Sequence, residues 1–441
     1  MPDPAVAKLQ ALVRIPTVSH RDPARVDTAA FDAFLAELTA QFPLVHEHLE
    51  LTAIATHALL FHWRGTSATR PVVLMAHLDV VPVDESAPWQ HPPFAAEIVD
   101  GDLWGRGTLD DKGSLVGICE AVERLLAQGF TPAQDVWLSF GCDEEVSGQA
   151  ARLAVAELTA RGVRPWFVLD EGGAVAGDAF PGVTTPVAVI GVTEKGTTSL
   201  ELTVAGRGGH ASTPAPHGPT ARLARAITRL ERSPFPAALP APTVTLLARL
   251  ADHAPAPLRP LMRHAGRLGP AVTRALIAAG PESAAMTRTT VAVTTLSGSP
   301  ALNVIASTAT AGLNIRVMVG DTVAGVVDHV RRVVKDDHVA ITVVEANEPS
   351  PVSPYDDDPA FALLEATIAA DFPDALVSPY VMMAATDSRF FTGICDRVYR
   401  FTPFRMSKAQ RESIHSYDER IGIDDLTDGI GWYQHLIERI R

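Results

Sequence analysis

The sequence is poor in cysteine, with three in 441 residues: Cys119, Cys142 and Cys395. Their number is odd, they lie far apart, and no two of them form a CxxC pair. A disulfide framework needs paired cysteines and a thiolate zinc cluster needs closely spaced ones, so the sequence argues against both. Because unpaired thiols persist in a reducing compartment, we expect a cytoplasmic protein.

Long hydrophobic runs are also absent. No apolar run approaches the roughly 20 residues that a membrane-spanning helix needs. Lys8 and Arg14 interrupt the apolar pattern near the N-terminus, where a signal peptide would have an unbroken core. Basic residues are outnumbered by acidic ones, 37 against 51, which gives a net charge of -14. We therefore expect neither nucleic acid nor an anionic membrane as a partner, whereas the acidic surplus suits a bound cation.

What the sequence does contain is apolar material for a large core, since 47% of its residues are hydrophobic. This length and composition suit two domains. Short apolar runs of the kind found in buried parallel strands are VVLMA after Pro71, VWLSF before Gly141 and FVL before Asp170. Helical periodicity lies between and around them, as at residues 28–41 and 115–126. We expect an α/β domain with a mixed, mostly parallel sheet flanked by helices.

Side chains able to bind a cation follow these apolar runs. His77 comes directly after the first run, Glu145 follows the second, and Asp170 ends the third. The stretch GRGTLDDKG, at residues 105–113, adds Asp110 in a segment without helical or strand periodicity. Because ligands of open α/β sheets bind at the carboxyl ends of the strands, these side chains are expected to meet. The combination predicts a metal site.

Each motif alone has a simpler explanation. The Asp-Asp pair could be a solvated turn closed by Lys112, and the glutamate pair an ordinary acidic loop. In HLD, strand alternation puts His77 and Asp79 on one side, where a carboxylate commonly fixes the tautomer of a metal-binding imidazole. Of two adjacent glutamates, one can bind metal while its neighbour, here Glu144, acts as a general base. The coincidence of three strand endings favours the metal site over these separate explanations.

The pattern changes after about residue 193. Strand, helix, two strands, helix and strand follow one another, which is the β-α-β-β-α-β order of a small ferredoxin-like domain. We therefore predict an inserted α+β domain at residues 194–349, within a catalytic domain made of residues 1–193 and 350–441. A stretch at residues 233–287, rich in Pro, Ala and Arg, has helical patches and no role that the sequence indicates.

Several motifs together carry a family resemblance over nearly the whole chain. HLDVVPVD, GRGTLDDKG, DEEVSG, GRGGHASTP and the late His415 occur in that order. With them, the sequence resembles the cocatalytic metallopeptidase family of carboxypeptidase S, aminoacylase, acetylornithine deacetylase and glutamate carboxypeptidase. LWGRGTLDDKGSL and WLSFGCDEEVSG are most similar to the carboxypeptidase S branch.

The resemblance implies two zinc ions in each subunit, bridged by Asp110. It implies His77 and Asp170 as the further ligands of one ion, and Glu145 and His415 as those of the other. Two imidazoles and three carboxylates form a mixed nitrogen and oxygen set that suits zinc, with cobalt or manganese as possible substitutes.

The resemblance also assigns catalytic roles. Asp79 would orient His77, and Glu144 would be the general base that takes a proton from the attacking water. The Asp110–Asp111 peptide bond is expected to be cis. The implied reaction is cleavage of an amide or peptide bond next to a free carboxylate, as in a carboxypeptidase or dipeptidase.

Substrate-binding residues are expected from both domains. In the inserted domain the resemblance indicates His210, Asn303 and Arg316, with the histidine reaching across a homodimer interface that this domain forms. In TDSRFF, Arg389 could hold a carboxylate by a bidentate pair. The simpler explanations are a loop histidine for His210 and an ordinary salt bridge for Arg389.

Two alternatives to a peptidase stay open. An N-acyl amino acid amidohydrolase, of the aminoacylase or deacetylase type, would use the same site on a different acyl group. A non-catalytic metal-binding dimerisation protein predicts erosion of the Glu144 position, which is intact. The sequence departs from the branch pattern at Cys142, Ala306 and Ala385, and these positions bear on substrate preference rather than on the ligands or the base.

Overall fold

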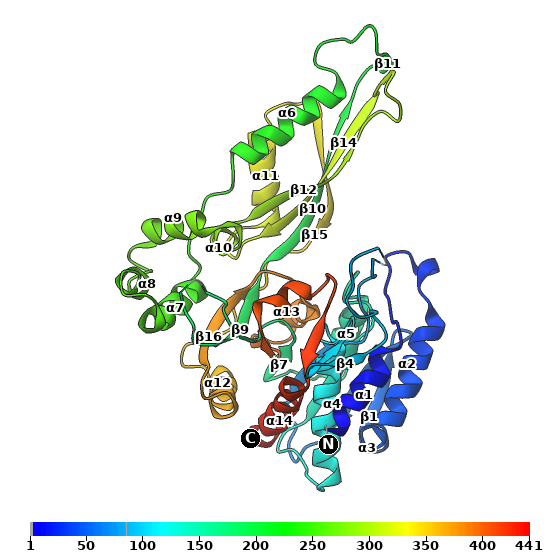
Figure 1. The fold of residues 1–441 in the computed structure, drawn as a ribbon, viewed down its shortest axis with the longest axis vertical. Helices are drawn as coiled ribbons and strands as arrows, with labels where there is room; N and C mark the ends of the chain where they lie inside the picture. Colours follow the sequence, from blue (N-terminus) through cyan, green and yellow to red (C-terminus); the bar gives the residue numbers. More distant parts are fainter. Residues whose placement is uncertain (1–2, 85, 181) are drawn as a thin grey trace.

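The computed structural model describes residues 3–84, 86–180 and 182–441 and consists of two bodies of unequal size. The larger body holds both ends of the described chain, and the smaller one rises from it as an elongated domain (Figure 1). Their sheets are separate, with ten strands in the larger body and four in the inserted domain. None of the helices in the described ranges is long and apolar enough to cross a membrane.

The large sheet is mixed and mostly parallel, as predicted. Its strand order is β1-β2-β6-β3-β7-β17-β9-β8-β18, with β16 beside β9. The bounds of these strands are β1 Glu50–Ile54, β2 Ala58–Trp63, β3 Val72–His77, β6 Val136–Gly141, β7 Phe167–Asp170, β8 Val175–Ala176, β9 Val187–Glu194, β16 Leu376–Met382, β17 Val398–Arg400 and β18 Arg405–Met406.

Strands β6, β3 and β7 are parallel neighbours at the centre of this sheet. Every residue of the three strands is buried, which explains why they read as continuous apolar runs rather than as alternating ones. Because they run in the same direction, their carboxyl ends lie at one edge of the sheet. The side chains that follow them are therefore brought together there.

Helices pack on both faces of the large sheet. Their bounds are α1 Pro4–Val13, α2 Thr28–Gln41, α3 Pro43–His48, α4 Lys112–Ala127, α5 Gln149–Ala160, α12 Pro359–Asp371, α13 Lys408–Ser413 and α14 Ile423–Arg439, with short 3-10 turns at η1 Pro23–Arg25, η2 Ala251–His253 and η3 Asp387–Gly393. Helix α4 begins directly after the Asp110–Asp111 pair, and its first eleven residues are all buried. The loop that carries Asp110 is thereby fixed to the centre of the core.

The inserted domain has the predicted ferredoxin-like order. Its elements are β10 Gly196–Ala205, α6 Pro219–Arg232, β12 Thr290–Ser297, β14 Thr308–Val317, α11 Val323–Val334 and β15 Val339–Ala346, in the sheet order β12-β14-β10-β15. One face of the sheet is buried under α6 and α11, so residues of β10 and β14 alternate between buried and less buried. The boundaries at 193/194 and 349/350 stay a prediction.

The stretch at residues 233–287 forms four short helices. They are α7 Ala241–Leu250, α8 Arg259–Arg263, α9 Gly269–Ala279 and α10 Pro281–Ala285. Leu246 and Leu250 of α7 pack with Val187 and Val189 of β9 in one apolar cluster. Helix α7 of this stretch thus packs on β9 and on the neighbouring strand β16 of the large sheet, partners that are far away in the sequence.

Two small sheets complete the described fold. One joins β4 Glu97–Val99, β5 Asp102–Trp104 and β19 Arg420–Gly422. The other pairs β11 Gly209–His210 with β13 Val304–Ile305 at the far tip of the inserted domain (Figure 1). The first of these sheets is important for the site, because β5 precedes the loop of Asp110 and β19 follows the loop of His415.

Candidate metal centre

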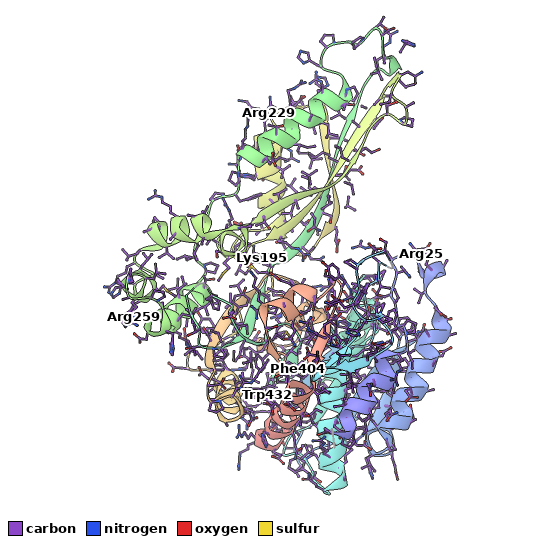
Figure 2. All side chains as sticks on the ribbon, in the orientation of Figure 1. Arg25, Lys195, Arg229, Arg259, Phe404 and Trp432 are labelled. Carbon is purple, nitrogen blue, oxygen red and sulfur yellow. The ribbon has the colours of Figure 1, made fainter. Side chains whose placement is uncertain are left out.

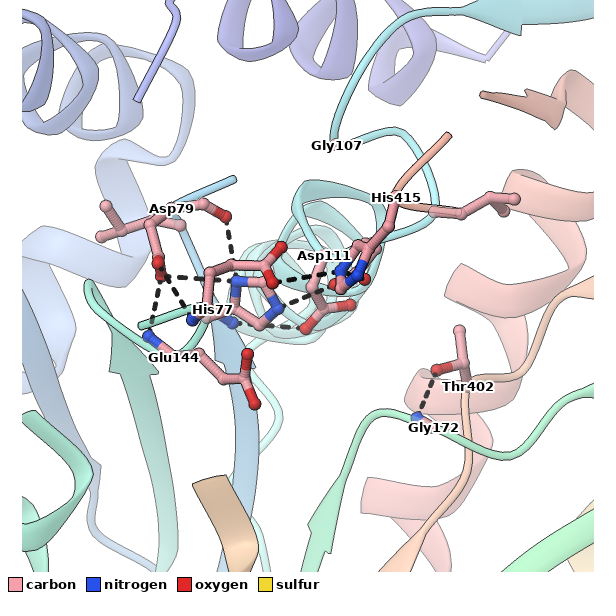
Figure 3. A network of polar contacts seen from close by, with 12 residues as sticks. His77, Asp79, Gly107, Asp111, Glu144, Gly172, Thr402 and His415 are labelled. Atoms are coloured by element: carbon pink, nitrogen blue, oxygen red, sulfur yellow. Dashed lines mark hydrogen bonds and ion pairs between the residues drawn. The ribbon is translucent and has the colours of Figure 1, made fainter. Parts of the chain in front are cut away.

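The side chains predicted to bind metal converge at the carboxyl edge of the central strands. His77 is the last residue of β3, Glu145 follows β6, and Asp170 is the last residue of β7. Asp110 enters from the loop between β5 and α4, and His415 enters from the segment after α13. Figure 3 shows the resulting network of polar contacts around His77 and His415.

Asp110 lies between the two histidines. Its Oδ1 is 2.9 Å from Nε2 of His77, and its Oδ2 is 3.0 Å from Nε2 of His415. The same nitrogen of His415 is 3.0 Å from Oε2 of Glu145. Ligand atoms of His77, Asp110 and Glu145 all lie within 4.8 Å of one another. One carboxylate that reaches two imidazoles through different oxygens has the arrangement of a bridging ligand.

Asp79 contacts both the imidazole of His77 and the loop that carries Glu144 and Glu145. Nδ1 of His77 is 2.9 Å from the backbone oxygen of Asp79 and 3.4 Å from its carboxylate. The carboxylate of Asp79 accepts the backbone N–H groups of Glu144, at 3.2 Å, and Glu145, at 3.3 Å. The contact that fixes the imidazole is therefore made mainly by the backbone, while the side chain orders the glutamate loop.

The peptide bond between Asp110 and Asp111 is cis, as predicted. Asp111 is fully buried, and its Oδ2 accepts the backbone N–H of His77 at 3.2 Å. Lys112 is also buried, and its ammonium donates to the backbone oxygens of Leu12 and Ile15. The proposal of a solvated Asp-Asp turn is therefore wrong, because both residues after Asp110 are inside the core.

The cluster carries more negative charge than the protein balances. Burial raises the pKa of Glu144, and the charges of Asp387 and Glu145 raise it further. Burial also raises the pKa of Glu145, with a further contribution from Asp110. Hydrogen bonds to Asp110 and Glu145 raise the pKa of His415 to about 10. Carboxylates that are crowded together repel one another, and either a proton or a bound cation relieves this repulsion.

The residues present fit a metal ion. Among the described residues, Oε1 of Glu145 is buried without a hydrogen-bond partner, although a buried carboxylate oxygen normally has one. The donor set combines imidazole nitrogens with carboxylate oxygens, which suits zinc, cobalt or manganese. An ion placed among these donors would satisfy the unpaired oxygen and reduce the repulsion between the carboxylates.

Two carboxylates, not one, stand at the end of β7. Oδ2 of Asp170 accepts the backbone N–H of Ser388 at 2.8 Å, which leaves its other oxygen for a ligand role. Burial raises the pKa of Glu171, and the charges of Asp110 and Asp111 raise it further. Glu171 therefore lies within the field of the cluster. Glu171 was not among the predicted site residues, although its position beside Asp170 at a strand end is a sequence signal.

Asp387 is a further acidic residue that the sequence analysis did not predict. It is buried, and among the described residues neither carboxylate oxygen has a hydrogen-bond partner. Burial raises its pKa to about 8. A methyl group built on Gly148 would lie 2.2 Å from Oδ1 of Asp387, so the loop after the two glutamates approaches this carboxylate closely.

The four predicted substrate-binding residues lie in different places. Arg389 belongs to the catalytic domain, where its Nη1 donates to the backbone oxygen of Thr386 at 2.7 Å and its guanidinium lies 4.4 Å from the ring centre of Phe390. Arg316 lies on β14, close to the start of β10, and donates to Thr197 at 3.0 Å. Neither arginine forms an ion pair within the described part of the chain.

His210 and Asn303 are exposed at the tip of the inserted domain. Nδ1 of His210 is 2.7 Å from the hydroxyl of Ser212. Strand β11, which ends with His210, is far from the metal cluster of the same chain (Figure 1). Arg389 therefore lies in the same domain as the cluster. His210 and Asn303 do not lie near that cluster.

The fold and the site define a class of protein. An α/β sheet with a histidine and carboxylate cluster at its strand ends, and with a ferredoxin-like insertion, is the arrangement of a metallohydrolase. The profile described as "Peptidase family M20/M25/M40" matches residues 73–439. The chain belongs to this family of peptidases and amidohydrolases.

Relatives within the family carry two kinds of name. The chain is 36% identical over 410 residues to "Probable carboxypeptidase S-like 2" of Dictyostelium discoideum, covering 91% of this chain and 78% of that protein. It is 34% identical over 436 residues to human "N-fatty-acyl-amino acid synthase/hydrolase PM20D1", covering 98% and 86%. The solved M20 family metallo-carboxypeptidase Sso-CP2 from Sulfolobus solfataricus has the same fold, with a TM-score of 0.70, 18% identity and 99% of both chains covered.

Proposed function

We propose that the chain is a di-zinc hydrolase that cleaves an amide or peptide bond next to a free carboxylate, as a carboxypeptidase or dipeptidase does. The observation that supports it best is the position of Asp110, whose two oxygens reach His77 and His415 separately. Zinc ions held there by these residues with Glu145 and Asp170 would polarise the scissile carbonyl and acidify a water molecule.

Glu144 is the proposed general base. Its backbone N–H is held by Asp79 at 3.2 Å, and Figure 3 shows its carboxylate at the other end of the side chain, turned away from Asp79. In this role Glu144 takes the proton of the attacking water and delivers it to the leaving nitrogen.

Arginine side chains account for the preference for a free carboxylate. Arg389 has a buried Nε without a partner among the described residues, so its guanidinium keeps donors available for a bidentate contact with a carboxylate. Arg316 of the inserted domain would add a second positive charge once that domain closes over the substrate.

We also propose a homodimer that forms through the inserted domain. Strands β12 and β15 are the edges of its sheet, and unpaired edges are templates for pairing with another chain. Leu296 on β12 and Val344 on β15 are 69% and 67% exposed. In such a dimer His210 of one subunit would complete the site of the other, where Asn303 would also contact substrate.

A second candidate is an N-acyl amino acid amidohydrolase. It uses the same ligands and the same base, and only the acyl group differs. The name of the human relative, an N-fatty-acyl-amino acid synthase/hydrolase, favours this alternative, whereas the name of the Dictyostelium relative favours the peptidase.

A substrate panel tests the proposal. Blocked dipeptides and N-acetyl and long-chain N-acyl amino acids would be offered to the wild type, to Glu144→Ala and to the control Glu47→Ala, which alters an exposed glutamate of α3. We expect Glu144→Ala to lose activity by at least about 100-fold and to keep about two metal ions per chain. The preferred substrate then distinguishes peptidase from acylase.

Removal of the metal provides the second half of this test. We expect a chelator to abolish hydrolysis and added zinc to restore it. A protein that binds metal but hydrolyses no member of the panel would contradict an enzymatic role, and full activity of Glu144→Ala would contradict the assignment of the base.

A further inference from the structure

A buried carboxylate outside the proposed ligand set holds the loop of Asp110. Glu419 follows His415 by four residues and has 0% of its surface exposed. Its Oε1 accepts three backbone N–H groups, from Gly107 at 3.0 Å, Leu109 at 2.9 Å and Asp110 at 3.2 Å. The last of these belongs to the residue that reaches both histidines.

The charge of Glu419 is balanced by one arginine. Arg106 is 2% exposed and donates to Oε2 of Glu419 through Nη1. Its Nη2 donates to the backbone oxygen of Ser416, the residue after His415. The guanidinium also lies 5.5 Å from the ring centre of Trp89. One buried ion pair therefore contacts both the loop of Asp110 and the loop of His415.

The backbone reinforces this connection. The N–H of Gly105 donates to the backbone oxygen of Glu419 at 2.9 Å, and the neighbouring residues pair as strands β5 and β19. Gly107 and Glu419 are 312 positions apart in the sequence. The two loops are too far apart in the sequence for local backbone geometry to fix the distance between them. That distance therefore depends on these tertiary contacts.

We propose that Glu419, paired with Arg106, is a positioning residue that sets the separation of Asp110 and His415 and thereby the affinity of the site for its metal ions. This inference rests on the proposed function. A carboxylate that accepts three N–H groups fixes the backbone of a loop more firmly than a neutral acceptor does, because hydrogen bonds to a charged group are stronger. Partners that orient metal ligands typically contribute about 10- to 100-fold to metal affinity.

The test compares Glu419→Gln with Asp418→Asn. Asp418 is a suitable control because it is the neighbouring buried carboxylate, and it binds a different loop, accepting the backbone N–H and the side-chain amide of Gln90, both at 2.8 Å. Zinc affinity would be measured by competition with a chromophoric chelator, and the visible spectrum of the cobalt-loaded protein would report ligand geometry. Thermal melting of the metal-free proteins would report stability.

We expect Glu419→Gln to bind zinc about 10- to 100-fold more weakly and to show an altered cobalt spectrum, with Asp418→Asn like the wild type in both. Wild-type affinity and spectrum in Glu419→Gln would overturn the inference, and so would an equal loss in Asp418→Asn. If Glu419→Gln does not fold, Arg106→Lys is tested in its place. Lysine keeps the positive charge but cannot donate to Glu419 and Ser416 through two separate nitrogens as the guanidinium does. Weaker zinc binding by Arg106→Lys supports the inference, and unchanged binding overturns it.

The outcome also separates this inference from the proposed function. If the wild type binds no zinc in the same titration, the proposed metal site is wrong and the inference falls with it. If the wild type binds zinc and Glu419→Gln binds it equally well, only the positioning role is wrong.

Discussion

At the scale of single residues, the loop of Asp110 packs closely against Gly113, at the start of α4. A methyl group on Gly113 would lie 2.2 Å from the backbone oxygen of Thr108 and 3.3 Å from the ring of Phe404. Since the nearer atom belongs to the backbone, the clash cannot be relieved by a change of side-chain rotamer. The turn and the first residues of α4 would have to move, and Asp110 lies between them.

We therefore expect Gly113→Ala to destabilise the protein by roughly 1–3 kcal/mol or more, as overpacking of a core does, and to weaken metal binding. The matched control is Gly431→Ala within α14, where a methyl group meets nothing within 4 Å. Alanine there is expected to stabilise by about 0.5–1 kcal/mol. Denaturant unfolding of the metal-free proteins checks both values, and equal stability of the two variants would contradict the prediction.

The two acids at the end of β7 make a second prediction at this scale. Oδ2 of Asp170 accepts a hydrogen bond from the backbone N–H of Ser388. This contact fixes the orientation of the carboxylate and leaves its other oxygen for the metal. We expect Asp170→Asn to lose about one of two metal ions per chain and Glu171→Gln to keep both. Metal content after dialysis would be measured by atomic absorption. The reverse result, with metal lost only in Glu171→Gln, would transfer the ligand role to Glu171.

At the scale of elements, one buried ion pair joins two strands of the large sheet next to the start of the inserted domain. Nε of Arg400, at the end of β17, is 3.0 Å from Oε2 of Glu194, at the end of β9, and both side chains are nearly unexposed. Oε2 of Glu194 also accepts the N–H of Thr386 at 3.0 Å, and Oε1 accepts the hydroxyl of Ser350 at 3.2 Å. Lys195 follows at the junction of the two bodies (Figure 2).

Breaking this pair from one side leaves a buried charge without a partner. We expect Glu194→Ala to cost about 3–5 kcal/mol of unfolding free energy, whereas replacing both partners by methionine costs less. The control is Asp328→Ala on α11, which removes an ion pair with Arg331 whose side chains are 69% and 65% exposed and is worth about 0–1 kcal/mol. Urea unfolding of the variants gives the comparison, and similar losses in Glu194→Ala and Asp328→Ala would count against it.

The elements that the sequence predicted are those with strong local signals. The helix expected at residues 28–41 is α2, which begins after Asp27, whose side chain accepts the N–H of Ala29 and Ala30. Strands β3, β6 and β7 were visible as apolar runs. Strand β1 was not predicted, because it is mostly exposed and has no continuous apolar pattern. Strand β2 was not predicted either, although all of its residues are buried.

The site residues divide in the same way, into those that have a local sequence signal and those that do not. His77, Asp110, Glu145 and Asp170 follow from strand ends and a glycine-rich loop. His415 lies in ESIHSYDERI, which has no such signal, and only the family resemblance indicated it. Glu419 and Asp387 were not predicted as site residues, because their partners lie hundreds of positions away or on loops whose approach depends on the tertiary fold.

At the scale of the whole molecule, the separation of the two bodies leaves two predicted residues, His210 and Asn303, away from the candidate site. His210 is exposed at the tip of the inserted domain, and the candidate metal ligands of its own chain lie in the other body (Figure 1). Within one chain its imidazole has nothing to act on. A symmetric dimer solves this geometric problem, because a closed twofold arrangement gives each subunit the same contact with its partner.

A mixture of two inactive variants tests this arrangement. Glu144→Ala lacks the base but keeps His210, and His210→Ala keeps the base. In a mixed dimer one site has its own Glu144 and receives His210 from the partner, while the other site has neither. Random co-assembly makes about half of the dimers mixed, so about one quarter of all sites should be active.

We expect co-expression of the two variants, carrying different affinity tags, to recover about one quarter of wild-type activity, and double-tag purification to enrich the active species. The control co-expresses Glu144→Ala with Glu144→Gln, where no site can be complete and activity should stay absent. Full activity of His210→Ala alone would show that the histidine is dispensable. Mixed dimers without activity would show that His210 acts, if at all, on its own chain, which would require the inserted domain to fold back over the metal cluster.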